Sequence, residues 1–195
     1  MAIIATQSKL HWTYFAALER DLEVVARYVE FAEANLGTFS LELAHLLMAA
    51  SSEVDVVAKL LCARLDPDSP RKNIDHYRDV LTRRLPDLSS MPVLIPRYGM
   101  RLTPWDNWTR GENPDWWRSY NNVKHERNAY FQEATLKNAL NSLAALLCLT
   151  FHFYQLDTPA EPERYRAKDT TASLQPESTL MRLEDHCYYE NLWAG

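Results

Sequence analysis

Glycine is scarce in this sequence. Only four of the 195 residues are glycines, and Gly37, Gly99, Gly111 and Gly195 never stand close together. Dinucleotide-binding turns and P-loops need several glycines at short spacing, because the backbone of these motifs approaches phosphate groups closely. The chain therefore has neither of these phosphate-binding motifs.

Cysteine motifs and metal-binding patterns are also missing. The three cysteines, Cys62, Cys148 and Cys187, are odd in number and contain no C-x-x-C pair. Isolated thiols of this kind are typical of a reducing compartment, so we expect a cytoplasmic protein. The six histidines form no His-Glu-x-x-His motif and no pair four residues apart. We therefore expect neither a metal site nor a cofactor.

The sequence has no long apolar run. The longest, residues 143–149, is short, whereas a membrane-spanning helix needs about 20 apolar residues. The first residues also lack the basic and apolar regions of a signal peptide. We therefore expect no association with a membrane.

Charge is unevenly distributed along the chain. The net charge is −5, from 21 basic and 26 acidic residues. Residues 71–127 contain 11 basic and 7 acidic residues, a net charge of +4. The remainder of the chain contains 10 basic and 19 acidic residues, a net charge of −9. The overall charge argues against a general polyanion binder. The basic middle is either a binding region for a phosphate-bearing ligand or a mixed, solvated surface.

Apolar residues recur at helical spacing in the first third of the chain. In one set, the apolar residues are alternately three and four positions apart, which predicts a long helix that ends at Gly37. This set consists of Phe15, Leu18, Leu22, Val25, Val29, Ala32 and Leu36. A second helix is predicted from about residue 40, with Thr38 or Ser40 as its N-cap, to about Leu65, before Pro67. With a short link at Gly37, the two helices should form an antiparallel pair.

A shorter helix and a long connection come next. Residues 73–84 predict the third helix, and Pro86 ends it. The segment 86–114 contains several prolines and predicts a loop with a small hairpin around Tyr98-Gly99. Connections of this length in a compact domain are often functional.

The last helical region begins at Asn113-Pro114-Asp115, which supplies an N-cap, a proline at the first helical position and an acid in the first turn. It extends to about Gln155, with a break expected near residues 125–128. Its second half has an apolar core stripe, made of Leu136, Leu140, Leu143, Leu147 and Phe151.

These elements predict an all-α fold of four main helices, with the long loop before the last helix. The helical domain should cover residues 1–156, and residues 157–195 should form an extended C-terminal tail. Residues 180–193 are apolar enough to dock on this chain or on a partner.

The second predicted helix carries a polar cluster in mid-course. Asp55 and Lys59 lie four residues apart and are typical of a surface pair. Ser52 and Glu53 lie beside the apolar stripe of the helix. Both are candidate contributors to a site, although a solvated surface is the alternative.

The segment 116–127 is the richest in functional groups. On an unbroken helix, Arg118 and His125 would lie within about 20° of one another around the axis, with Asn121 on the same face. A guanidinium, an amide and an imidazole on one face can bind a phosphodiester and cleave it. The imidazole would move protons, the guanidinium would neutralise the charge developing on phosphorus, and no metal is required.

In these residues the chain resembles the HEPN superfamily (higher eukaryotes and prokaryotes nucleotide-binding). The resemblance covers residues 10–155 and rests on the Arg-x4–6-His motif, present as Arg118-x6-His125, and on the surrounding Trp-Trp and Tyr-Asn-x-x-Lys-His-x-Arg strings. It implies a HEPN-like helical bundle. Arg71-x4-His76 also matches the motif, but it opens a short middle helix instead of the last long one.

The resemblance implies a metal-independent endoribonuclease of a bacterial defence or toxin–antitoxin system. His125 would be the acid/base and Arg118 the phosphate stabiliser; the implied substrate-binding residues are Asn121, Asn122, Lys124 and Arg127. It also implies a homodimer in which two such sets face one cleft, with RNA as substrate and an antitoxin or defence-system protein as partner. The aromatic loop 105–117 should offer apolar surface to this dimer.

A second interpretation remains open. The chain is then a non-catalytic HEPN-like module that binds a nucleotide or a partner protein. In that case Trp116 and Trp117 are core anchors, and Arg118 makes a structural salt bridge. Loss of toxicity on expression when His125 is replaced by Ala would favour the enzyme.

Overall fold

The computed structural model describes residues 8–159 and 163–189. This part of the chain forms six α-helices and one two-stranded antiparallel sheet, which confirms a mostly helical fold with a small hairpin. The elements are α1 (Leu10–Val25), α2 (Leu41–Leu65), α3 (Ile74–Arg84), β1 (Val93–Ile95), β2 (Met100–Leu102), α4 (Asp115–Tyr130), α5 (Leu136–Gln155) and α6 (Glu163–Ser173). None of these helices is long and apolar enough to cross a lipid bilayer.

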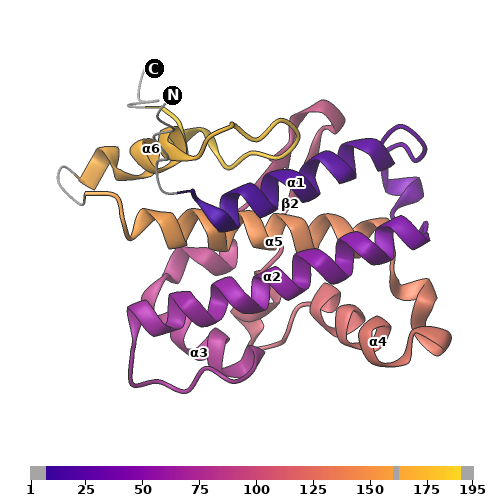
Figure 1. The fold of residues 1–195 in the computed structure, drawn as a ribbon, viewed down its shortest axis with the longest axis horizontal. Helices are drawn as coiled ribbons and strands as arrows, with labels where there is room; N and C mark the ends of the chain where they lie inside the picture. Colours follow the sequence, from indigo (N-terminus) through magenta and orange to yellow (C-terminus); the bar gives the residue numbers. More distant parts are fainter. Residues whose placement is uncertain (1–7, 160–162, 190–195) are drawn as a thin grey trace, which may run out of the picture.

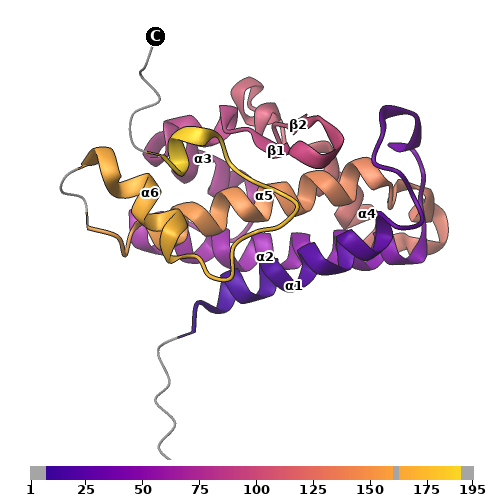
Figure 2. The same ribbon diagram turned by 90° about the horizontal axis from the view of Figure 1, so that it is seen from above.

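Helix α5 forms the centre of the bundle. It packs along α2, and α1, α4 and α6 also contact it. The antiparallel pair α1–α2 lies on one side of α5, and the hairpin and α3 lie on the other (Figures 1 and 2). Of the 20 residues of α5, 15 are buried, including the whole predicted stripe from Leu136 to Phe151. An apolar helix of this kind needs neighbours on nearly every side.

Helix α1 is shorter than predicted. It ends at Val25, although the helical spacing continues to Leu36, and residues 26–40 form turns and a short 3₁₀ helix. The chain leaves the helix because Phe31 packs under the hairpin, where its ring centroid lies 4.9 Å from that of Tyr98. Gly37 does not adopt a positive φ. The predicted short link at Gly37 was therefore wrong, although the antiparallel pairing of the two helices is present.

Helices α2 and α3 begin and end as predicted. The Ser40 hydroxyl accepts the backbone N–H of Leu43 at 3.1 Å, and the Asn73 side chain accepts that of His76 at 3.1 Å. Each bond satisfies one of the unpaired donors at a helix start. Of the two cap candidates of α2, Thr38 and Ser40, the structure therefore uses Ser40.

The long connection between α3 and α4 packs its aromatic residues inward. Strands β1 and β2 pair Val93 with Leu102, and the turn between them contains Gly99 at φ 61°. Trp105 is fully buried, and its ring centroid lies 5.3 Å from that of Trp116. The expected apolar surface on this loop is therefore absent, because the tryptophans fill the core beneath it.

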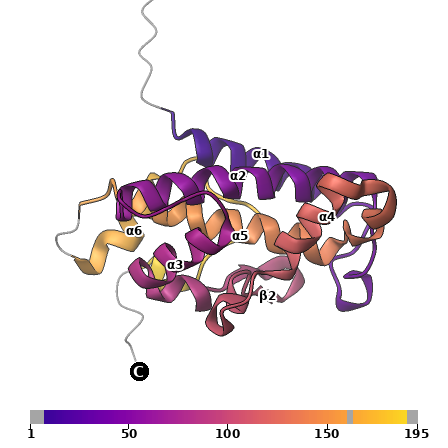
Figure 3. The ribbon, with the colours of Figure 1, turned by 90° about the horizontal axis from the view of Figure 1, so that it is seen from below.

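The predicted last helical region is two helices. Pro114 takes the N-cap position of α4, while the Asn113 side chain accepts Arg78 Nη1 at 3.0 Å instead of capping. Glu126 departs from helical geometry at the place where a break was expected. Helix α5 then starts again at Leu136, where the Thr135 hydroxyl accepts the N–H of Asn138 at 3.2 Å. Helices α4 and α6 lie at opposite ends of the bundle (Figure 3).

The C-terminal region is not the extended tail that its composition predicts. Residues 163–173 form α6, which packs against α5. Apolar residues of the following segment, 174–189, are buried: Leu174, Leu180, Met181, Leu183 and Cys187. The expected docking of residues 180–193 is thus present as far as Tyr189, and residues 190–193 lie outside the described part. Glu19 of α1 holds this segment, because its carboxylate accepts the backbone N–H groups of Thr179, Leu180 and Met181 at 3.0, 3.1 and 2.8 Å.

Candidate functional site

Arg118 and His125 share the solvent-facing side of α4. Both side chains are exposed. Glu126 is the one residue of α4 with non-helical torsions (φ −137°, ψ 51°), so the helix is regular from Arg118 to His125. Residues seven apart on a regular helix lie about 10 Å apart along the axis and nearly in line around it. The predicted common face therefore exists.

Arg118 is paired with an acid that sequence analysis did not include in the site. Its Nη2 lies 3.0 Å from Oδ1 of Asp115, and the two side chains are 68% and 61% exposed. An exposed pair contributes little to stability, so a phosphate can compete for the guanidinium. The spacing of three residues between an acid and an arginine on a helix was the signal for this pair. The pairing also directs Arg118 away from His125, toward the start of α4.

The predicted amides lie beside Arg118. Asn121 and Asn122 line, with Arg118 and Trp117, a cavity of about 570 Å³ that we call the α4 cavity. The Asn121 Nδ2 donates to the Trp117 carbonyl at 2.9 Å, and the Asn122 Nδ2 donates to the Glu133 carboxylate at 3.0 and 3.3 Å. These bonds fix both amides and leave their oxygens free to accept hydrogen bonds from a ligand.

The remaining predicted residues of α4 extend from this cavity as a basic strip. Nζ of Lys124 lies 5.3 Å from the centre of the Tyr120 ring. His125 and Arg127 are exposed, and neither has a hydrogen-bond or ion-pair partner within residues 8–159 and 163–189. Because Lys124 and Arg127 have no ion-pair partner in this part of the chain, the strip favours an anionic ligand.

The candidate residues of α2 lie elsewhere. Ser52 is exposed, and Glu53 is on the side of α2 that packs against α1, where its Oε1 lies 2.6 Å from Nδ1 of His11. The Tyr154 hydroxyl accepts the backbone N–H of His11 at 3.2 Å. Glu53 therefore joins α1 to α2 and is not brought to Arg118 and His125. No spacing rule indicated that His11 would be its partner.

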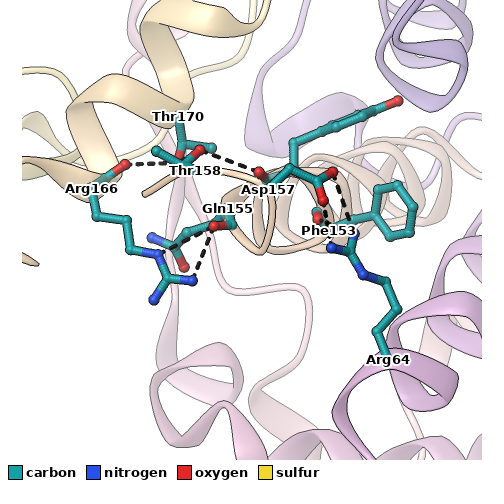
Figure 4. A network of polar contacts seen from close by, with 8 residues as sticks. Arg64, Phe153, Gln155, Asp157, Thr158, Arg166 and Thr170 are labelled. Atoms are coloured by element: carbon teal, nitrogen blue, oxygen red, sulfur yellow. Dashed lines mark hydrogen bonds and ion pairs between the residues drawn. The ribbon is translucent and has the colours of Figure 1, made fainter. Parts of the chain in front are cut away.

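His11 and Tyr154 also line the largest described cavity, of about 670 Å³, at the start of α1 and the end of α5. Its lining residues Phe153, Asp157 and Thr158 also belong to a polar network at the end of α5 (Figure 4). Arg64 donates to the Asp157 carboxylate at 2.5 Å and to the Phe153 carbonyl at 3.1 Å. Arg166 donates to the Gln155 carbonyl. The Asp157 carboxylate is thus already neutralised, and the network closes the end of α5.

The second motif match has a structural role. Arg71 donates to the Pro67 carbonyl at 2.8 Å, and Nδ1 of His76 accepts the backbone N–H of Lys72 at 3.2 Å. Both residues therefore stabilise the loop that leads into α3. Arg71 and His76 are only partly exposed, whereas Arg118 and His125 are exposed.

The thiols are unsuited to nucleophilic chemistry. Burial raises the pKa of Cys62 to about 11 and that of Cys187 to about 12, and it also raises the pKa of Cys148. Thiolates are the reactive form, so these cysteines act as small apolar residues. Among the described residues, no three His, Cys, Asp or Glu side chains are grouped as metal ligands.

Comparison with other proteins gives no independent guide to this site. No protein-family model matches the chain, and no significant match was found among curated proteins or among solved structures.

Proposed function

We propose that this protein is a HEPN-like, metal-independent endoribonuclease of a bacterial defence or toxin–antitoxin system. The observation that carries the proposal is the arrangement on α4, where Arg118 and Asn121 line one cavity and His125 follows about two turns after Arg118 on the same exposed side. The unneutralised Lys124 and Arg127 would bind neighbouring phosphates. The three free thiols are consistent with a cytoplasmic location.

The proposed reaction is a transfer within the RNA chain. His125 takes the proton of a ribose 2′-hydroxyl, and the resulting oxygen attacks the adjacent phosphorus. The bond to the 5′-oxygen breaks, the protonated imidazole of His125 gives its proton to this oxygen, and the products are a 2′,3′-cyclic phosphate and a 5′-hydroxyl. Arg118 stabilises the negative charge on the phosphorus oxygens in the transition state.

A second copy of the chain completes the proposed site. Within one protomer Arg118 and His125 lie about 10 Å apart along the axis of α4, and Arg118 is paired with Asp115, which supports a site shared between two copies. We propose a homodimer in which the exposed sides of two α4 helices face each other across the RNA. An antitoxin or defence-system protein would control access to this cleft.

The test is cleavage of a structured RNA in excess EDTA, with analysis of the product ends. The parent protein should give cyclic phosphate ends, and His125→Ala should abolish cleavage. Arg118→Lys should retain little activity, because an ammonium cannot reproduce the bidentate guanidinium. His76→Ala is the matched control and should cleave like the parent. Equal cleavage by His125→Ala, or no cleavage of any RNA, would refute the nuclease.

A non-catalytic nucleotide-binding or protein-binding module is the second candidate. Two observations favour it: Trp116 and Trp117 are buried, and Arg118 is held in an ion pair with Asp115. This candidate predicts nucleotide or partner binding without cleavage. The same EDTA assay, combined with a binding measurement, separates the two.

A further inference from the structure

A second polar cavity lies on the other side of the first turn of α4. It measures about 300 Å³ and is bounded by β2, the segment after it, and the starts of α4 and α5. Six of its lining residues are cations or amides: Arg101, Arg110, Lys137, Asn107, Asn138 and Asn141. We call it the β2–α5 cavity. None of these six residues was selected by the sequence motifs.

The cations of this cavity are only partly neutralised. Most of its charges are already paired: Arg101 lies 3.2 Å from Glu184, Arg110 lies 4.0 Å from Asp106 and 3.6 Å from Glu112, and Asp115 pairs with Arg118 at 3.0 Å. The exposed Lys137 has no ion-pair partner within the described ranges. Lys137 is therefore the lining cation that is left for a ligand, and its exposed ammonium group favours phosphate.

The amides supply the other half of a nucleotide site. The Asn138 Nδ2 donates to the Glu133 carbonyl at 2.8 Å, and the Asn141 Nδ2 donates to the Lys137 carbonyl at 2.9 Å. Their side-chain oxygens accept no hydrogen bond in the described part of the chain, and the Asn107 side chain makes none there. Fixed amide oxygens and one free amide can read the edge of an unpaired base.

The wall of the cavity is preformed. Trp116 Nε1 donates to the Pro104 carbonyl at 2.8 Å, and both residues line the cavity. The buried Trp105 packs against Trp116 from behind. A site whose groups are already held in place loses less entropy when it binds a ligand.

One ion pair connects this cavity to the candidate site. Asp115 lines the β2–α5 cavity, and its partner Arg118 lines the α4 cavity. We infer that the β2–α5 cavity is a subsite for a phosphate and an unpaired base of the RNA chain whose neighbouring nucleotide is bound at Arg118. This inference rests on the proposed function, because it takes RNA as the ligand.

The test measures the binding of a fluorescent single-stranded RNA to His125→Ala protein, so that cleavage does not interfere. Adding Lys137→Ala should raise the Kd about fivefold at low salt and reduce the slope of log Kd against log salt by about one, as expected for one lost phosphate contact. Lys72→Ala removes an exposed cation that lines neither cavity and should change neither quantity. Unchanged thermal unfolding would show that both variants are folded.

The outcomes separate the subsite from the nuclease. Unchanged Kd and salt slope in the Lys137→Ala protein would overturn the subsite, whether or not the parent cleaves RNA. RNA binding that depends on Lys137, in a parent that never cleaves, would support the subsite and refute the nuclease. If Lys137→Ala weakens binding of 5′-AMP and leaves RNA binding unchanged, the ligand is a free nucleotide and the inference about an RNA chain is wrong.

Discussion

Nδ1 of His11 lies 2.6 Å from Oε1 of Glu53, and this contact joins α1 to α2 across an otherwise apolar interface. The side chains are only 11% and 15% exposed. Each therefore depends on the other for a hydrogen bond that water supplies poorly at this depth. The pair also fixes the start of α1 beside Tyr154 of α5.

Replacing one member of this pair should cost more than replacing both. We expect Glu53→Leu to lower the free energy of unfolding by about 2 kcal/mol, because the His11 ring is left without its partner. The double variant His11→Leu/Glu53→Leu should recover part of this loss. Urea denaturation of the single and double variants measures the coupling. Ser52→Ala, on the exposed side of α2, is the control, and its free energy of unfolding should stay within about 0.5 kcal/mol of that of the parent. If the losses of the two single variants simply add in the double variant, the pairing is contradicted.

Local signals were enough to predict α2, α3 and the apolar stripe of α5, because the apolar spacing and the helix-ending prolines are contained in short stretches of sequence. The same signals placed α4 and α5 in one helical region, and the start of α5 at Leu136 was not predicted. The end of α1 was not predictable, because the helical spacing of apolar residues persists beyond Val25. Phe31 instead packs against Tyr98, a residue that is distant in the sequence. The candidate face on α4 follows from spacing alone, whereas the β2–α5 cavity joins residues from four separate segments.

The docked C-terminal segment should depend on Glu19. Its carboxylate is buried and accepts three consecutive backbone N–H groups and the Ser178 hydroxyl. In Glu19→Ala these donors lose their acceptor, so we expect a local loss of about 3 kcal/mol. Hydrogen exchange should become faster in residues 178–183 and stay unchanged in α2. Glu23→Ala, which removes a single bond to Thr179, is the control. Unchanged protection in the Glu19→Ala protein would show that apolar burial alone holds the segment.

Stability should fall in mild acid because of His152. This side chain is buried in α5 without a hydrogen-bond partner for either ring nitrogen in the described structure. Burial lowers its pKa to about 4. In the unfolded chain the His152 imidazole has a pKa near 6.5, so it binds a proton more readily than in the folded chain. The neutral imidazole therefore contributes its full stability above pH 6.5. This contribution is lost as the pH falls from 6.5 toward 4.

The expected loss from this group is about 3 kcal/mol between pH 7 and pH 4. Urea unfolding of the parent and of His152→Leu at several pH values measures the part of the free energy of unfolding that comes from His152, because the other titrating groups contribute equally to both proteins. The parent should lose stability more steeply than the variant. Parallel curves would mean that His152 binds a proton as readily in the folded chain as in the unfolded chain.

The ion pair between Asp115 and Arg118 distinguishes the two candidate functions. If Arg118 binds phosphate, Asp115→Asn should lower the Kd for RNA several-fold, because a competing negative charge beside the guanidinium is removed. Stability should stay within about 0.5 kcal/mol, since the pair is exposed. Anisotropy titrations and urea denaturation measure the two effects, and Asp79→Asn, an exposed acid on α3, controls for the change in net charge. A loss of stability above about 1 kcal/mol with unchanged RNA binding would assign Arg118 a structural role and leave the binding module as the better interpretation.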